Sequence, residues 1–390
     1  MSESLSITYI VPHDPMAPGS RLGASVSTRE IAVEMARRGH DVTLVHSYVG
    51  ASRRLIDEGV QVYAVPNHEY PYVGGFTANS AVARFLSEFG RTHKGDIIDA
   101  RGAGIGWAFK QNSRLWHTPV FHPVDIGLAE WRSLPFGGQL ATAPKYFMLV
   151  YNEKLCVEVA HWIVVETTSG GQELGRLYPD ASHKWTALPP PIPQSWAPRK
   201  DTSYDRSRLL FIGAGPRRDT ELFLNTLHLL SDQGLQVTAT IVREERQQFR
   251  ELASRWRLKV RFARFIPETE MREAMAGSCA FVLPSHREAY CRSVVEAAYL
   301  GTPSVVSDLP SVREFVHDGQ NGIVVSSWDP EDWARALELL IRDSGLRNRL
   351  GDAAKVMATE NYSAERIGNL TEKGYRDALV GRGPHHHASP

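Results

Sequence analysis

The alternation of short apolar strands with amphipathic helices, interrupted once and then restarted, most constrains the fold of this chain. Ser6–Pro12 has the pattern of a buried strand, and a Gly/Pro-rich loop follows it. A helix that starts near Ser27 ends at Gly39, before the next strand at Val42–Val45. Such a strand–loop–helix–strand unit opens a doubly wound parallel sheet. Further strands are expected at 62–65, 96–99, 120–122 and 162–166.

The interruption lies between Leu188 and Arg208. This segment holds five of the 23 prolines and little periodic pattern, which is typical of an interdomain linker. The alternation then restarts, with strands expected at 209–212, 237–242, 260–262, 281–283 and 304–306.

The sequence therefore predicts an α/β protein with two Rossmann-like doubly wound parallel sheets that face a cleft. The predicted parts are an N-terminal Rossmann-like domain at 1–190, a linker at 191–208, a C-terminal Rossmann-like domain at 209–360, a helix at 361–380 and a disordered tail at 381–390.

The composition excludes several classes of protein. Lys and Arg number 44, as do Asp and Glu, so the basic excess expected of a nucleic-acid-binding protein is missing. Three scattered cysteines, Cys156, Cys279 and Cys291, are too few for a disulfide framework or a zinc site. Glu3 stands where a signal peptide carries positive charge, and no run approaches the roughly 20 apolar residues of a membrane span. We expect a cytoplasmic protein with no integral membrane segment.

The segment 281–322 carries the strongest chemical signal. It predicts a strand, a loop with Glu288, and a helix with Glu296 in its early turns. The first amides of that helix, at residues 291–293, are expected to lack intrahelical partners and to form an anion site suited to phosphate. Glu296 could then bind a ribose diol and Glu288 a sugar. From the residues alone, two solvated surface carboxylates explain the pattern equally well.

The same segment closely resembles the E-x7-E signature of the retaining GT-B glycosyltransferases of family 4. The matching positions are Pro284, Ser285, Glu288, Tyr290, Cys291, Glu296, Ala297, Gly301, Pro303, Val305 and Val306, followed by Asp318-Gly-Gln-Asn-Gly322. The resemblance implies a GT-B fold and transfer from a nucleoside-diphosphate sugar with retained configuration. It also implies that the domain at 1–190 is the acceptor side, that the domain at 209–360 binds the nucleotide sugar, and that the helix at 361–380 crosses back onto the N-terminal domain.

Outside this segment, several single positions also match the family's pattern. Gly23 matches the second glycine of the family's N-terminal loop, whereas Leu22 replaces the first. His122 matches a histidine that the resemblance places near the donor sugar and the acceptor, although a core or capping histidine remains an alternative. The run GDIIDARG is similar to the family's D-(apolar)2-H-x-H segment.

At several positions the sequence differs from the family's pattern. Ala214 stands where the family has a diphosphate-binding arginine, and Arg217, Arg218 or Arg292 could compensate. Cys291 replaces a glycine, and Arg264 stands near the expected base pocket. The predicted catalytic residues are His122 and Glu288. The predicted donor-binding residues are Gly23, Arg217, Arg218, Tyr290, Cys291, Arg292, Ser293 and Glu296.

The expected reaction is hexosyl transfer to a small-molecule acceptor, with UDP as the favoured donor nucleotide and GDP or ADP as alternatives. No metal ion or cofactor is expected, because fixed cations and a helix dipole can stabilise the leaving diphosphate. A homodimer is left open. The alternatives are a GT-B protein that binds nucleotide sugars without transferring them, which Ala214 favours, and a GT-B epimerase or phosphorylase.

Overall fold

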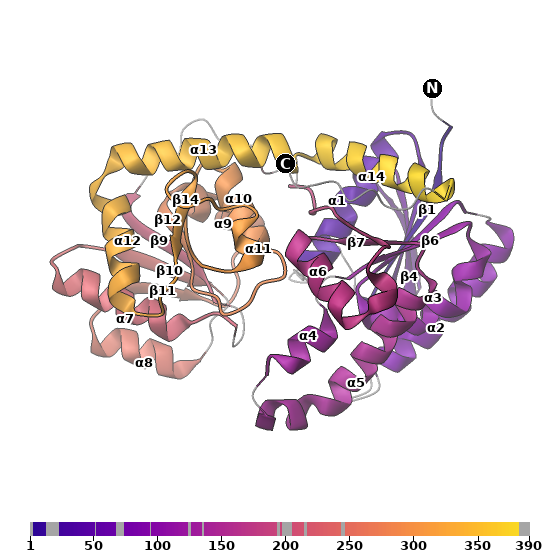
Figure 1. The fold of residues 1–390 in the computed structure, drawn as a ribbon, viewed down its shortest axis with the longest axis horizontal. Helices are drawn as coiled ribbons and strands as arrows, with labels where there is room; N and C mark the ends of the chain where they lie inside the picture. The colour runs from indigo at the N-terminus through magenta and orange to yellow at the C-terminus, as the bar shows by residue number, and fades with distance from the viewer. Residues whose placement is uncertain are drawn as a thin grey trace. The chain divides into compact units, whose positions relative to one another are not determined.

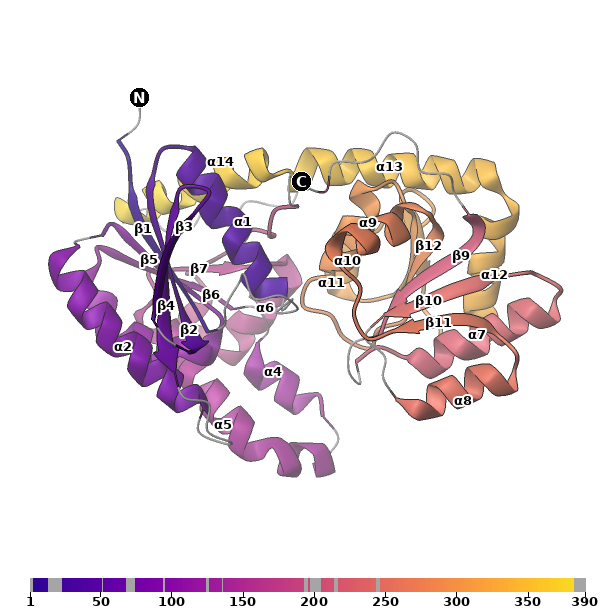
Figure 2. The same ribbon diagram turned by 180° about the vertical axis from the view of Figure 1, so that it is seen from behind.

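The computed structural model describes residues 3–12, 23–50, 52–67, 74–93, 95–123, 126–134, 136–192, 196, 205–213, 217–242 and 246–381. The chain forms two compact units. Unit 1 comprises Met1–Pro191 and Ala364–Pro390, and unit 2 comprises Ile192–Ser363. Each unit is a parallel sheet covered by helices, so the predicted α/β fold class is confirmed (Figures 1 and 2). The predicted tail falls outside the described residues from 382 onward.

Unit 1 contains an eight-stranded sheet with the order β3-β4-β2-β1-β5-β6-β7-β8. The strands are β1 (Ser6–Val11), β2 (Asp41–Val49), β3 (Arg53–Asp57), β4 (Val60–Asn67), β5 (Ile97–Arg101), β6 (Thr118–His122), β7 (Trp162–Val165) and β8 (Trp185–Ala187). All neighbours are parallel except β3, which pairs antiparallel with β4. Sequence analysis missed the two edge strands, β3 and β8. Strand β3 is almost fully exposed and carries no apolar alternation.

Helices cover both faces of this sheet. They are α1 (Gly23–Arg37), α2 (Gly74–Thr92), α3 (Gly106–Asn112), α4 (Gly127–Arg132), α5 (Phe136–Val159), α6 (Thr168–Leu177) and α14 (Ala364–Leu379). Ile31 of α1 and Tyr375 of α14 pack with Tyr9 and Val120 on one face. Helices α2, α3 and α5 pack against the opposite face. The apolar stripe of each helix is therefore buried on the sheet.

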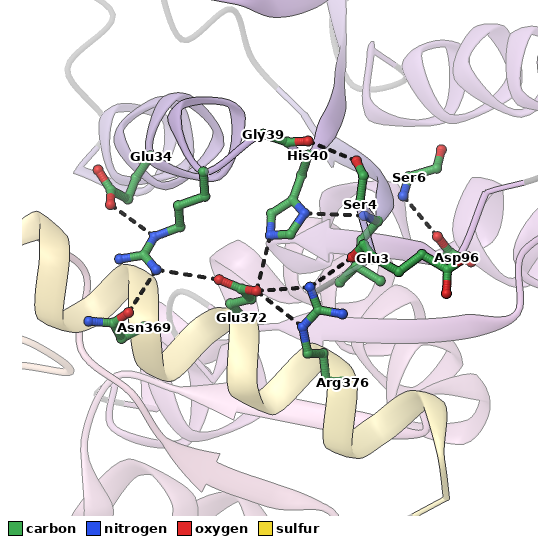
Figure 3. A network of polar contacts seen from close by, with 12 residues as sticks. Glu3, Ser4, Ser6, Glu34, Gly39, His40, Asp96, Asn369, Glu372 and Arg376 are labelled. Atoms are coloured by element: carbon green, nitrogen blue, oxygen red, sulfur yellow. Dashed lines mark hydrogen bonds and ion pairs between the residues drawn. The ribbon is translucent and has the colours of Figure 1, made fainter. Parts of the chain in front are cut away.

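The C-terminal helix α14 is fixed to unit 1 by a polar network and by close packing. Glu372 lies between two arginines: it accepts from Arg376 Nη2 at 2.9 Å and from Arg38 Nη1 of the loop after α1 at 3.4 Å (Figure 3). The ring of His40 lies 3.6 Å from the same carboxylate. A Cβ atom on Gly374 would stand 2.2 Å from the Trp162 ring, so only glycine permits this approach.

Unit 2 contains a six-stranded parallel sheet with the order β11-β10-β9-β12-β13-β14. The strands are β9 (Asp205–Ile212), β10 (Thr238–Val242), β11 (Lys259–Ala263), β12 (Ser278–Leu283), β13 (Ser304–Ser307) and β14 (Gly322–Val325). Counted within the unit, this is the Rossmann order 3-2-1-4-5-6. Strand β9 begins at Asp205, so the predicted linker end at 208 is wrong by a few residues. Of that linker, 193–195 and 197–204 lie outside the described residues.

The helices of unit 2 again form two layers. They are α7 (Thr220–Asp232), α8 (Gln247–Arg255), α9 (Glu268–Ala276), α10 (Arg292–Tyr299), α11 (Pro310–Arg313), α12 (Pro330–Arg342) and α13 (Ser344–Tyr362). Helices α7, α8 and α12 share one core, and α9, α10 and α13 share the other. Helix α12 starts as the sequence predicts: the Asp329 carboxylate accepts from the Glu331 amide at 3.0 Å, with Pro330 first in the helix.

Candidate active site

The candidate site of unit 2 lies where the strand order reverses, between β9 and β12. The connections that leave these two neighbouring strands run to opposite sides, and ligands of doubly wound sheets bind at such switch points. The loops after β9 and β12 are joined there. Arg218 forms an isolated antiparallel bridge with Ser285, and the His286 amide donates to the Arg217 carbonyl at 2.8 Å. Residues that are distant in sequence are therefore held together.

Glu288 is the most constrained carboxylate of this corner. Its Oε1 accepts from Arg218 Nε at 2.9 Å and from Ser285 Oγ at 2.7 Å. Its carbonyl accepts from Ser311 Oγ at 2.7 Å. The second carboxylate oxygen, Oε2, has no hydrogen-bond partner among the described residues. The side chain thus presents one oriented acceptor.

Arg218 is held equally firmly. Besides the bond to Glu288, its Nη1 donates to the Ile212 carbonyl at 2.7 Å. Its side chain is only 15% exposed, and no described residue accepts from its Nη2. One face of the guanidinium is fixed, and one N–H edge is left for an anion.

The start of α10 differs in part from the prediction. Cys291 is the N-cap residue, and its carbonyl accepts from the amides of Val294 and Val295 at 2.9 and 3.2 Å. The Arg292 amide donates to the Tyr290 carbonyl, which lies before the helix, at 3.0 Å; this amide is therefore occupied although its partner is not intrahelical. Ser293 Oγ, in contrast, is buried and has no hydrogen-bond partner among the described residues. Such an orphan polar atom is common at ligand sites.

Two predicted donor-binding residues on α10 pair with each other. Arg292 Nε donates to Glu296 Oε1 at 2.7 Å, one helical turn apart. This pair offsets the charge of Arg292, which sequence analysis assigned to the diphosphate. Tyr290 packs edge-on against Phe315, with ring centroids 5.3 Å apart. Burial raises the pKa of the Cys291 thiol well above its usual value, so this cysteine carries no thiolate at neutral pH.

His122 ends β6 in unit 1, in register with Arg101 at the end of β5. The imidazole is buried and has no hydrogen-bond partner among the described residues. Burial, and then the charge of Arg101, lower the pKa of His122 well below its usual value. The ring is therefore neutral at physiological pH and can both donate and accept a hydrogen bond.

Beside His122 lies a buried ion pair that sequence analysis did not single out. Asp99 Oδ2 accepts from Arg101 Nη2 at 3.2 Å and from the Tyr375 hydroxyl at 2.6 Å. Burial raises the pKa of Asp99, against the opposing effect of Arg101. The signal was present in the run GDIIDARG, where Asp and Arg occupy both histidine positions of the family pattern.

Gly23, the remaining predicted donor-binding residue, is the first residue of α1. The loop before it, with Leu22, and Ala214 lie outside the described residues.

Within the described parts of the chain, no cluster of three or more His, Cys, Asp or Glu side chains forms a metal site. Nor does any described helix combine the length and apolarity needed to cross a membrane.

Models of glycosyltransferase families match both halves of the chain. The model of the glycosyl transferase 4-like domain matches residues 23–190, and the model of glycosyl transferases group 1 matches residues 198–357. The chain is a GT-B glycosyltransferase of the family 4 type. This glycosyltransferase is therefore an enzyme, and the predicted family is confirmed.

Individual relatives agree with that assignment. The D-inositol 3-phosphate glycosyltransferase of Streptosporangium roseum is 25% identical over 382 residues, which cover 89% of this chain and 86% of the relative. The sucrose-phosphate synthase of Thermosynechococcus elongatus has a similar structure, with a TM-score of 0.77, 17% identity, and coverage of 96% and 99%. HepE of Anabaena, in complex with UDP-glucose, gives a TM-score of 0.73, 15% identity, and coverage of 96% and 100%. At these identities, the two structures support the fold of this glycosyltransferase and nothing beyond it.

Proposed function

We propose that this glycosyltransferase transfers a sugar from a nucleoside-diphosphate sugar to a hydroxyl group of a small-molecule acceptor, with retention of configuration. The observation that carries the proposal is the Arg218–Glu288 pair at the switch point of unit 2, 2.9 Å between Nε and Oε1. It places a fixed cation and an oriented carboxylate at the edge where doubly wound sheets bind nucleotides.

In the proposed donor site, the Nη2 edge of Arg218 and the side chain of Arg217 bind the diphosphate. Ser293 Oγ supplies a further hydrogen bond at the start of α10, and Glu296 binds the ribose diol. Guanidinium groups suit phosphate oxygens because they donate in parallel pairs. UDP is the proposed nucleotide, with GDP and ADP as alternatives; the UDP-glucose complex of HepE supports UDP.

The proposed chemistry passes through an oxocarbenium-like transition state. The arginines stabilise the charge that develops on the leaving diphosphate, and no metal ion is needed for this. Glu288 Oε2 orients the sugar through its hydroxyl groups. We do not assign Glu288 as a covalent nucleophile, because Glu296, the other glutamate of the pair, is bonded to Arg292 and the two do not form the paired-carboxylate arrangement of hydrolases. We also propose a catalytic role for His122 of unit 1, whose imidazole is neutral.

The acceptor is proposed to be a small polyol. The Streptosporangium roseum relative is a D-inositol 3-phosphate glycosyltransferase, and inositol phosphate belongs to this class of acceptor. The buried Asp99–Arg101 pair at the end of β5 adds both a donor and an acceptor of hydrogen bonds near His122.

A donor screen tests the proposal. UDP, GDP and ADP are each titrated against the protein in a thermal-shift assay, in EDTA and then with added Mg²⁺. The expected result is a rise in the melting temperature with one nucleotide, unchanged by EDTA. Stabilisation by none of the three nucleotides would contradict the proposed donor class.

A further inference from the structure

Unit 2 carries a dense cluster of exposed cations on α8 and the edge strand β11. Between residues 246 and 264 there are seven basic side chains and one carboxylate, in a chain whose total charge is balanced. All seven are exposed, and Figures 1 and 2 show α8 at the margin of unit 2. The α8–β11 basic surface comprises Arg246, Arg250, Arg255, Arg257, Lys259, Arg261 and Arg264.

Few of these charges are offset by neighbouring carboxylates. Arg261 pairs with Glu270 at 2.6 Å, but Arg250, Arg255 and Arg257 form no ion pair with another described residue. Some exposed arginines elsewhere in unit 2 do form ion pairs. On α12, for instance, Arg342 Nε lies 2.6 Å from Glu338 Oε1. Within the described residues, Arg250, Arg255 and Arg257 therefore contribute positive charge that no ion pair offsets.

Two guanidinium groups of this surface lie over aromatic rings. Arg246 Cζ stands 4.3 Å from the Phe249 ring centroid, and Arg250 Cζ stands 4.9 Å from that of Phe262. Cation–π contact of this kind restrains the guanidinium while its in-plane N–H groups remain directed outward. A restrained guanidinium loses less entropy when it binds a phosphate group than a fully mobile one does.

Protection of the sheet edge explains only part of the cluster. Strand β11 is an edge strand, and charges such as Lys259 and Arg261 discourage pairing with another chain. Arg250 and Arg255, however, lie on α8, and Arg257 lies in the turn before β11. At those three positions there is no strand edge to protect, so their shared charge needs another explanation.

We propose that the α8–β11 basic surface binds the phosphate groups of an anionic lipid membrane. The charge is complementary, and Phe265, 47% exposed beside Arg264, supplies an aromatic group of the kind that inserts at the membrane interface. The exposed Phe265 favours a membrane over a nucleic acid, because the membrane interface has an apolar layer that accommodates the ring and the phosphate backbone of a duplex has none. The glycosyltransferase would then attach peripherally, through unit 2.

Vesicle flotation tests the proposal on the full-length protein. Vesicles of phosphatidylglycerol and phosphatidylcholine are compared with vesicles of phosphatidylcholine alone, at 0.05 M and at about 0.5 M salt. The expected result is flotation with the anionic vesicles only, and loss of flotation at the higher salt. Equal flotation with both kinds of vesicle, or with neither, overturns the proposal.

Two matched variants locate the surface. The triple variant Arg250→Gln, Arg255→Gln, Arg257→Gln should bind anionic vesicles about a hundredfold more weakly, because each cation near the surface adds roughly fivefold. The control, Arg335→Gln, Arg342→Gln, Arg349→Gln, removes the same charge from α12 and α13 and should bind like the wild type. Equal losses in both variants would overturn the assignment of the surface.

Two further measurements complete the test. Unchanged circular dichroism and unchanged nucleotide stabilisation establish that the first triple variant is folded and that its donor site is intact. A failure of nucleotide stabilisation in the wild type would affect the proposed function and leave the membrane result standing. If the surface instead binds duplex DNA while anionic vesicles do not compete, the partner is a nucleic acid and the membrane proposal is wrong.

Discussion

The Nε atom of Arg218 lies 2.9 Å from Oε1 of Glu288, across 70 positions of sequence. Sequence analysis assigned the arginine to the diphosphate and the glutamate to the sugar. The pairing makes one charged unit of them, because each residue fixes the orientation of the other. The groups left over, Arg218 Nη2 and Glu288 Oε2, are those that the proposed reaction uses.

Breaking this pair should reduce turnover strongly. Arg218→Gln and Glu288→Gln are each expected to lower kcat by about a hundredfold or more, the size typical of losing a positioned group at a transition state. The double variant should lose much less than the product of the two effects, since the residues act as a unit. Steady-state kinetics of the four proteins measures this. Effects that simply multiply would mean that the two residues act independently and that the pair is not a functional unit.

The ribose assignment gives a prediction about binding alone. Glu296→Ala should weaken binding of the nucleoside diphosphate by about 1–3 kcal/mol, the size of a lost hydrogen bond to a charged group. Isothermal titration calorimetry with UDP measures it. The control is Glu338→Ala on α12, where the glutamate pairs with Arg342 at i, i+4 spacing in the opposite order. If the folded Glu296 variant binds UDP like this control, the assignment is wrong.

Docking of α14 brings Gly374 into close contact with the Trp162 ring. Gly374→Ala should lower the free energy of unfolding by about 1–3 kcal/mol, because the new atom would stand 2.2 Å from the Trp162 ring. Gly137→Ala on α5 is the control: no atom lies within 4 Å of its Cβ position, and alanine favours the helix. Urea denaturation distinguishes the two. Equal midpoints for both variants would show that the α14 contact tolerates the extra atom.

Burial of His122 predicts a pH dependence of stability. The pKa of His122 is lowered in the folded state, so the unfolded chain binds a proton that the folded chain does not. The stability that this residue contributes is present above its unfolded pKa of about 6.5 and is lost as the pH falls below it.

The slope from one such histidine is at most about 1.4 kcal/mol per pH unit. Urea midpoints between pH 7.5 and 5.5 measure it. His122→Asn should flatten the slope, whereas His183→Asn, at an exposed position of the same unit, should keep it. A wild-type slope in His122→Asn would mean that this imidazole is protonated in the folded protein as readily as in the unfolded chain.

Much of the fold could be predicted because buried parallel strands are short apolar runs. The strands near Ile10 and Phe281 are of this type, and both are fully buried. The strands that the sequence did not predict are not buried apolar runs of this type. Strand β3 is exposed, and β14 follows a turn whose Gly and Asn residues hide a four-residue pattern. Edge strands gain their structure from pairing, which a local pattern does not reveal.

The candidate site was predictable in its members but not in its contacts. The spacing of Glu288 and Glu296 places both after one strand, which fixes their neighbourhood. The bond of Glu288 to Arg218 depends on the pairing of β9 with β12, and the Asp99–Tyr375 bond depends on the docking of α14. Such long-range pairings are set by topology, so residue spacing alone cannot reveal them.

The central claim is transfer from a nucleoside-diphosphate sugar by the Arg218–Glu288 site. The most direct measurement is an NMR time course with UDP-glucose and D-inositol 3-phosphate, run in EDTA with the wild type and with Glu288→Gln. The account predicts that the wild type forms UDP and a glycoside that keeps the anomeric configuration of the donor, and that Glu288→Gln forms neither at a comparable rate. An inverted product, or equal turnover by the two proteins, would contradict it.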